Sequence, residues 1–283
     1  MNEPVQFPAL LPVAPEMVLA VGTMALLMFG VYTRSARLPL LANRIGILIL
    51  IIAGLLVVAL PAGQLVTFGG SFIVDDFARV MKVLALIGSA VALVMSPSYL
   101  AAEKQEKFEY AILILLSTLG MMLLASAADL IALYLGLELM SLALYVRAAV
   151  QRDSVRPAEA GLKYFVLGAL SSGMLLYGAS LIYGATGTVS FAGIAQEATA
   201  GTVGLIFGIV FLFAGFCFKV SAVPFHMWTP DVYEGAPTPI TAFFAAAPKV
   251  AAIAMFVRAT IASFPAVTSQ WQQILVFVAL ASS

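Results

Sequence analysis

The sequence predicts an all-α integral membrane protein, a polytopic bundle of about eight full transmembrane helices followed by the start of a ninth. Of its 283 residues, 63% are hydrophobic and only 10% are charged, whereas soluble domains carry about 25% charged residues. The mean hydropathy is +1.07. The apolar residues also fall into runs of about 20, the length that a spanning helix needs. These observations exclude a soluble globular protein and a disordered one.

Eight apolar runs have roughly the length of a membrane span, and turn-forming or charged residues such as Pro61, Pro97 and Asp129 separate them. The runs cover residues 16–33, 45–61, 72–95, 110–127, 130–148, 160–183, 202–222 and 238–259. A ninth run begins near Trp271 and continues to Ser283. We therefore expect the chain to be part of a longer protein.

The polar composition excludes several classes of site. The N-terminal residues are acidic and proline-rich and lack the basic region of a signal peptide. Cys217 is the single cysteine, which excludes a disulfide framework and a cysteine-ligated metal or Fe–S site. One histidine, His226, cannot supply a pair of haem ligands, and we expect no metal site and no redox cofactor in this chain. Fourteen basic and 14 acidic residues cancel, so nothing points to nucleic acid.

The positions of the basic residues predict the orientation. The short loops after the first, third and fifth spans carry Lys and Arg, and the remaining loops carry none. These loop cations are Arg34, Arg37, Arg44, Lys104, Lys107, Arg147, Arg152 and Arg156. Because short cytoplasmic loops carry the excess of Lys and Arg, we expect this side to be cytoplasmic and the N-terminus periplasmic. The membrane is then the bacterial inner membrane, or the mitochondrial inner membrane if the protein is organellar.

Two ionisable residues lie deep inside spans. Glu138 lies eight residues into the fifth span, about 12 Å deep, and Lys249 lies eleven residues into the eighth, about 16 Å deep. Pro248 precedes Lys249 and predicts a local helix break. Such residues are costly in lipid and are functional candidates. The alternatives are a protonated core glutamate and a structural ion pair of the lysine.

Three further residues extend this set. Lys219 lies late in the seventh span, and Pro224 interrupts the apolar segment that follows, so we expect a discontinuous seventh helix broken around 219–224. The alternative for Lys219 is snorkelling to the interface. Lys163 follows Glu159 by four residues, the spacing of a surface ion pair, and is equally compatible with that role. His226 has a side chain suited to proton relay.

The remaining membrane charges favour structural roles. Asp75, Asp76, Arg79 and Lys82 lie within two turns at the outer end of the third span, and we expect one local ion-pair cluster. Arg258 lies near an outer helix end, and we expect it to snorkel.

An acid and several lysines at mid-depth on different helices are typical of a proton or ion path. A carboxylate about 4 Å from an ammonium contributes about 4 kcal/mol at an effective dielectric constant near 20. Movement of the carboxylate could therefore switch a buried lysine between its charged and neutral forms.

Two stretches carry a specific family resemblance. They are LYLGLELMSLALYV (133–146), which holds Glu138, and GFCFKVSAVPFHMWTPDVYEGAPTPITAFFAAAPKVA (215–251). Both resemble the antiporter-like membrane subunits of proton-pumping NADH–quinone oxidoreductase, respiratory complex I. KYFVLGALSSG (163–173) adds to the match, which extends from about Phe72 to the end of the chain.

The resemblance implies a fold of fourteen helices built on two inverted five-helix repeats. It divides this chain into an N-terminal three-helix segment (1–97), the first repeat (109–264) and the start of the next helix (265–283). It places Glu138 and Lys219 on the family's glutamate of helix five and lysine of helix seven. Lys249 falls on the helix-eight lysine of the central hydrated axis, and Lys163 on a helix-six lysine characteristic of one paralogue. The second repeat is absent from the sequence.

The implied function is proton translocation through this Glu/Lys path. FMN, Fe–S clusters and quinone would belong to partner subunits, and the partners would be the other membrane subunits of a hetero-oligomeric complex I together with the lipid bilayer. The alternatives are a subunit of a multi-subunit Na⁺/H⁺ antiporter, a subunit of a membrane-bound hydrogenase, and a structural membrane subunit that does not pump.

The orientation can be tested with a single engineered cysteine. In a Cys217→Ser background, we expect Arg37→Cys to react with a membrane-impermeant maleimide from the cytoplasmic side, because the loop that carries it is rich in Arg. Labelling of this position from the periplasmic side would contradict the predicted topology.

Overall fold

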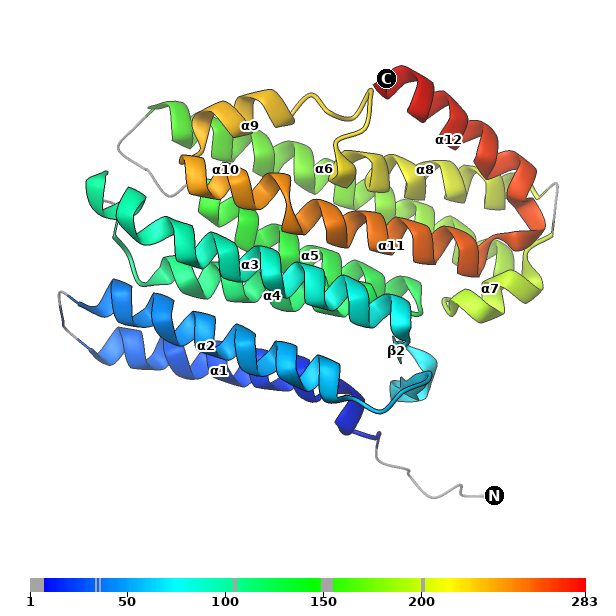
Figure 1. Cartoon of the computed structure of the whole chain (residues 1–283). Helices are drawn as coiled ribbons and strands as arrows, with labels where there is room; N and C mark the ends of the chain where they lie inside the picture. The colour runs from blue at the N-terminus through cyan, green and yellow to red at the C-terminus, as the bar shows by residue number, and fades with distance from the viewer. Residues whose placement is uncertain (1–7, 34, 36, 104–105, 149–154, 200–201) are drawn as a thin grey trace.

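The computed structural model describes residues 8–283 except 34, 36, 104–105, 149–154 and 200–201. Long helices run roughly parallel or antiparallel to one another in a single bundle (Figure 1). The first two helices lie on one side and the helices near the C-terminus on the opposite side. The helices are α1 (Ala14–Tyr32), α2 (Leu38–Ala59), α3 (Asp76–Ala102), α4 (Glu109–Ser126), α5 (Leu130–Ala148), α6 (Val155–Thr186), α7 (Phe191–Glu197), α8 (Val203–Val220), α9 (Thr229–Gly235), α10 (Thr238–Ala245), α11 (Ala247–Ser263) and α12 (Thr268–Ser282).

The helices match the predicted spans. Seven helical segments of the described chain are long and apolar enough to cross a membrane. Helix α5 adds a shorter apolar stretch, Leu130–Val146. Together these segments correspond to the eight predicted runs, and α12 begins at Thr268, where the ninth was expected.

The third span differs from its prediction at both ends. Residues 72–74, expected to open the helix, form strand β2 (Phe72–Val74), which pairs antiparallel with β1 (Leu65–Thr67). Asp75 then caps the helix, because its Oδ1 accepts a hydrogen bond of 2.7 Å from the Ala78 N–H. At the other end α3 continues through Pro97 to Ala102, so the boundary expected at residue 97 is wrong.

Pro97 is tolerated inside α3 because a side chain from α2 replaces the backbone donor that proline lacks. Proline at position i leaves the carbonyl of residue i−4 without its helical partner, and here that carbonyl belongs to Leu93. Asn43 Nδ2 donates a hydrogen bond of 2.6 Å to this oxygen. Inside a membrane an unsatisfied carbonyl costs several kcal/mol, so this contact ties α2 to α3.

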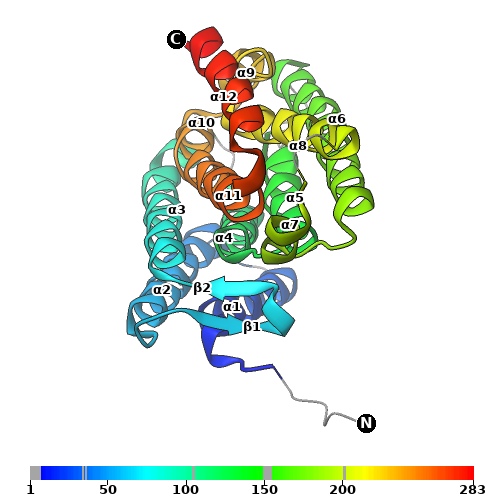
Figure 2. The same cartoon turned by 90° about the vertical axis from the view of Figure 1, so that its right-hand side faces the viewer.

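The hairpin marks one end of the bundle, here called the hairpin end. Figure 2 views the bundle from this end, with β1, β2 and α7 nearest the viewer. There the segment between α4 and α5 forms isolated β-bridges with two neighbouring segments. Ala127 pairs with Phe72 of β2, and Asp129 pairs with Ser190, which precedes α7. Helix α7 lies in a segment that the sequence predicted to be a loop.

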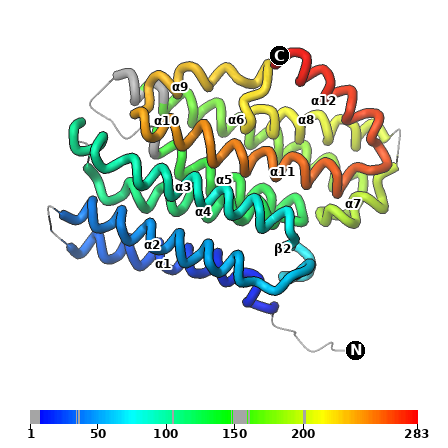
Figure 3. Tube along the Cα trace, viewed as in Figure 1, coloured from blue at the N-terminus to red at the C-terminus, as the bar shows by residue number. Residues whose placement is uncertain are grey.

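The basic segments share the opposite end. The C-terminal ends of α1, α3 and α5 and the N-terminal ends of α2, α4 and α6 all lie there (Figure 3). Arg37 and Lys107 belong to this end, whereas Arg34, Lys104 and Arg152 fall outside the described residues.

Close helix contacts position α5. A Cβ added to Gly120 of α4 would lie 2.4 Å from the Met140 nitrogen and 2.8 Å from the Gly136 oxygen, both in α5. Helices approach this closely in membranes where small residues face each other. The same arrangement joins α6 to α8, where a Cβ on Gly178 would lie 2.7 Å from the Gly208 oxygen. These two contacts fix α5 against α4 and α8 against α6.

We expect Asn43→Ala to destabilise the protein by about 1 kcal/mol, because it removes the donor to the Leu93 carbonyl. This loss is smaller than the full cost of an unsatisfied carbonyl in lipid, because the unfolded chain in the membrane also finds hydrogen-bond partners. In a Pro97→Ala background the backbone N–H restores the helical bond, and the same substitution should cost less. Denaturation of the four purified proteins gives this double-mutant cycle. Independent, additive effects would show that Asn43 does not compensate for the proline.

Candidate functional site

The predicted discontinuity of the seventh span is present. Helix α8 ends at Val220, and Ser221 has the left-handed backbone conformation (φ 62°). The chain then follows an irregular path until α9 begins at Thr229, as Figure 1 shows between α8 and α9. The break thus starts three residues before Pro224. Lys219 lies in the last turn of α8 and is buried, with 8% of its surface exposed.

Local hydrogen bonds satisfy the backbone at this break. The Ala222 N–H donates to the Cys217 oxygen at 2.8 Å and the Ser221 N–H to the Phe218 oxygen at 3.2 Å. Trp228 Nε1 donates to the same Phe218 oxygen at 3.0 Å. Irregular backbone at membrane depth is tolerated only where protein groups or water satisfy it. These hydrogen bonds therefore stabilise the break, and the Lys219 side chain is held beside it.

The Lys219 ammonium group contacts one face of α5. Nζ donates hydrogen bonds to Ser141 Oγ at 2.8 Å and to Tyr145 Oη at 3.1 Å, and both partners are buried. Glu138 lies three and seven residues before these partners, on the same helical face.

Glu138 lies on the same face of α5 without direct contact to the lysine. Among the described residues no ion pair within 4.0 Å joins Glu138 to Lys219. Glu138 Oε1 is buried and has no hydrogen-bond partner in the same part of the chain. Glu138 lies one helical turn before Ser141, the direct partner of the Lys219 ammonium group, on the same face of α5. The structure thus places the acid and the lysine together, with the Ser141 hydroxyl beside the lysine.

Two aromatic rings lie beside the lysine, whose Nζ is 5.4 Å from the centroid of the Tyr145 ring and 5.7 Å from that of Phe218. The rings of Tyr145 and Tyr164 meet edge to face at 4.7 Å, and Tyr164 stacks on Trp228 at 4.6 Å. Gly168 of α6 makes room for Tyr145, since an added Cβ would lie 2.0 Å from the tyrosine hydroxyl. The phenol of Tyr145 is therefore fixed by packing and presents its hydroxyl to Lys219.

Lys249 lies at a second helix break. Helix α10 ends at Ala245, Ala246 has a non-helical conformation (φ −111°, ψ −86°), and α11 begins at Ala247 with Pro248 in its first turn. Lys249 is half-buried, and its Nζ lies 5.4 Å from the centroid of the Tyr233 ring, within cation–π range.

Lys163 lies at the surface of the chain. Its Nζ is 2.9 Å from Glu159 Oε1, the ion pair that the spacing predicts, and 2.8 Å from Asp231 Oδ2 of α9. Its side chain is 44% exposed. Lys163 therefore links α6 to α9 and does not touch Lys219 or Glu138.

His226 lies in the turn between α8 and α9 and is exposed. Within the described part of the chain, no three His, Cys, Asp or Glu residues are grouped so as to hold a metal ion.

The outer charges pair differently from the prediction. Lys82 Nζ lies 2.6 Å from Glu16 Oε1 of α1, and both side chains are buried. Arg79 donates to the carbonyl oxygens of Pro61 and Gly63. The expected local cluster is wrong because the side chains of α3 at this level point towards different neighbouring segments.

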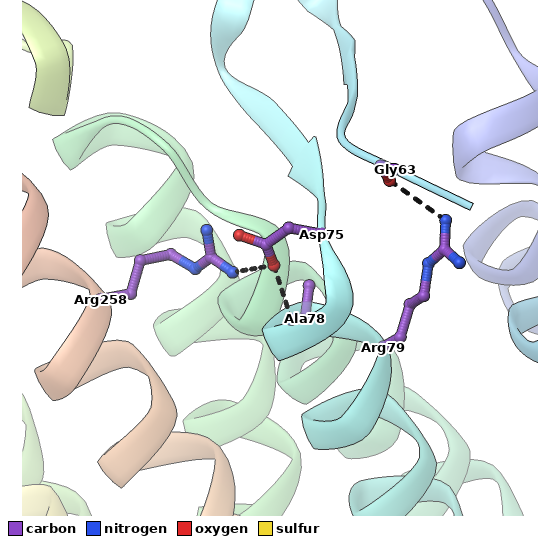
Figure 4. A network of polar contacts seen from close by, with 5 residues as sticks. All are labelled: Gly63, Asp75, Ala78, Arg79 and Arg258. Carbon is purple, nitrogen blue, oxygen red and sulfur yellow. Dashed lines mark hydrogen bonds and ion pairs between the residues drawn. The ribbon is translucent and has the colours of Figure 1, made fainter. Parts of the chain in front are cut away.

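Arg258 also departs from its prediction. It does not snorkel, since its Nη2 lies 2.6 Å from Asp75 Oδ1 and its side chain is 10% exposed (Figure 4). Burial alone would raise the pKa of Asp75, but the hydrogen bonds from Arg258 and Ala78 hold that pKa below its ordinary value. The pair therefore contributes stability at neutral pH that is lost as the pH falls through the lowered pKa.

Sequence reasoning missed several residues of this site. Ser141 and Tyr145 follow Glu138 by three and seven residues, and this helical spacing could have identified them. Trp228, Asp231 and Gly168 act through contacts between elements, for which the sequence carries no local signal.

A family model described as NADH:quinone oxidoreductase/Mrp antiporter, transmembrane, matches residues 127–283, more than half of the chain. The chain belongs to this family of membrane proteins. The matched region contains Glu138, Lys219 and Lys249, together with the breaks in α8–α9 and α10–α11.

Individual relatives refine this placement. The chain is 64% identical over 275 residues to the NADH-quinone oxidoreductase subunit N of Azorhizobium caulinodans, an alignment that covers 97% of this chain and 58% of the relative. The chain thus spans about 58% of the length of that relative. A chain in the structure of respiratory complex I from Thermus thermophilus with bound aureothin matches with a TM-score of 0.75 and 34% identity, over 86% of this chain and 52% of that chain.

A more distant structure shares the fold alone. A chain of the Mrp complex from Dietzia matches with a TM-score of 0.68 at 23% identity, over 88% of this chain and 48% of that chain. The antiporter-like fold is therefore common to this chain and to both assemblies.

We expect Gly168→Ala to destabilise the protein by about 1–3 kcal/mol, because the new methyl group overlaps the Tyr145 hydroxyl. Gly173→Ala, on the same helix with open space around it, is the matched control and should be neutral or slightly stabilising. Thermal unfolding of the purified proteins compares the two. Equal unfolding temperatures would mean that Tyr145 moves freely.

Proposed function

We propose that this chain belongs to subunit N of a bacterial NADH–quinone oxidoreductase and takes part in proton translocation through the membrane arm. The 64% identity to a subunit N supports this assignment over the Mrp-type alternative, whose match is 23% identical. The observation that carries the proposed function is the buried Lys219 ammonium, which is held at a helix break by Ser141 and Tyr145 on the same helix as Glu138.

This arrangement can work as a charge switch. A buried ammonium is tolerated while hydroxyls solvate it and a carboxylate lies nearby. If α5 shifts and Glu138 moves away, the charged form of Lys219 loses that support and releases its proton. Because Ser141 and Tyr145 can each accept and donate hydrogen bonds, they can pass the proton along the face of α5.

The remaining predicted residues extend the pathway in the same proposal. Lys249, at the break before α11, would receive the proton from Lys219. Lys163 and His226 would act on the side of the basic loops, where Lys163 is exposed to water and paired with two carboxylates. We propose that this side is cytoplasmic and that the N-terminus is periplasmic.

Partners would carry the redox chemistry. In this proposal FMN, the Fe–S clusters and quinone belong to other subunits, and this chain contributes no redox centre. Co-purification with flavin- and Fe–S-containing subunits distinguishes this assembly from a stand-alone Na⁺/H⁺ antiporter.

The test replaces the lysine in the complete enzyme. We expect Lys219→Met, which preserves the length and apolar stem of the side chain, to reduce proton pumping about 100-fold or more, as expected for the loss of a proton-transfer group. Lys107→Met, at an exposed position between α3 and α4, is the control and should pump normally. Proton uptake by inverted membrane vesicles and the amount of assembled complex are measured together.

The two measurements separate a pump from a scaffold. Normal pumping by an assembled Lys219→Met enzyme would exclude the proposed role. Failure of assembly would be resolved with Ser141→Ala and Glu138→Gln, which leave the volume of the site nearly unchanged and should also lower pumping.

A further inference from the structure

An apolar groove runs between α2 and α3 on the outside of the bundle. Its volume is about 250 Å³, and every side chain that lines it is apolar. Leu50, Gly54 and Val58 line it from α2, and Val83, Ile87 and Ala90 line it from α3. Gly54 deepens the groove, since the nearest atom to a Cβ added there would be Leu86 Cδ1 at 3.8 Å.

The groove is somewhat shorter than the hydrocarbon of one lipid leaflet. Leu50 and Val58 are eight residues apart on α2, or about 12 Å. The hydrocarbon of one leaflet is about 15 Å thick, half of the bilayer core. The groove also begins near the middle of both helices and ends towards the hairpin end. Its position thus follows the path of an acyl chain from the midplane to the headgroup region.

The side chain of Arg79 lies near the end of the groove that faces the hairpin end of the bundle. Arg79 lies one helical turn before Val83, and its Nη2 donates to the Pro61 and Gly63 oxygens of the segment that follows α2. Figure 4 shows the contact with Gly63. Both bonds use Nη2, one of the three guanidinium nitrogens. Because Nε is buried, a phosphate would reach the guanidinium through its terminal nitrogens. In the same part of the chain no carboxylate lies within 4.0 Å of Arg79, although Asp76 is three residues away.

We propose that this groove binds a phospholipid of the leaflet at the hairpin end, with one acyl chain between α2 and α3 and the phosphate on Arg79. Guanidinium groups bind phosphate oxygens through paired hydrogen bonds, and Arg79 has donors to spare. The occupant would hold α2 against α3 through contacts that neither helix can make alone.

The first test fills the groove. The complete subunit, purified in its assembly, is incubated with phosphatidylglycerol, and retained lipids are counted by native mass spectrometry. We expect Gly54→Leu to retain one phospholipid fewer per subunit than the wild type. Gly173→Leu, the same substitution in the open surroundings of α6, should retain the wild-type number. Equal retention by Gly54→Leu and wild type overturns the proposal.

The second test separates the headgroup from the acyl chain. Retention of phosphatidylglycerol is compared with that of diacylglycerol, which lacks the phosphate. We expect Arg79→Gln to weaken phosphatidylglycerol retention about fivefold and to leave diacylglycerol retention unchanged, with partial recovery in Arg79→Lys. Equal losses for both lipids would show that Arg79 only supports the local fold, and the phosphate site would be wrong.

A photoreactive amino acid at Ile87 identifies the occupant in the native membrane. The proposal requires adducts with the mass of a phospholipid. An adduct to another protein subunit would show that a helix covers the groove and would overturn the proposal.

Discussion

The bilayer offers no hydrogen bonds, and this constraint governs every irregular feature of the structure. At two places where helical hydrogen bonds are lost, substitute partners are present. Asn43 replaces the donor that Pro97 lacks, and Trp228 donates to the Phe218 carbonyl where α8 ends. The break beside Lys219 is therefore stable and can hold a charged group at a defined position.

Helix α5 combines packing and chemistry. On one side, Gly136 lies so close to α4 that no larger residue would fit. Another face of the same helix is polar and carries Glu138, Ser141 and Tyr145. Tight packing on one side makes the polar face on the other geometrically precise. Ser141, and not Glu138, makes the direct contact with the lysine. No direct bond therefore fixes the distance between the acid and Lys219, and a small displacement of this helix would change it.

Charges outside this site tie the N-terminal helices to the rest of the bundle. The buried Glu16–Lys82 pair joins α1 to α3, and Asp75–Arg258 joins the start of α3 to α11, the helix that begins beside Lys249. Breaking a buried pair leaves an uncompensated charge, which is strongly destabilising. The Glu16–Lys82 pair therefore holds α1 against α3, and the Asp75–Arg258 pair restricts how α3 and α11 can move relative to one another.

The sequence by itself determined the membrane class, the spans, the distribution of basic loops and the breaks near Pro224 and Pro248, because these depend on local hydrophobicity, charge and proline geometry. It also identified Glu138, Lys219 and Lys249 as unusual, since a charge in an apolar run is visible without a structure. The tertiary structure alone decided which groups meet. Lys82 has two acidic residues nearby in sequence but pairs with Glu16, which is 66 residues away. Arg258 pairs with Asp75, 183 residues away. Helix rotation and packing set these partners, and neither is encoded in a single span.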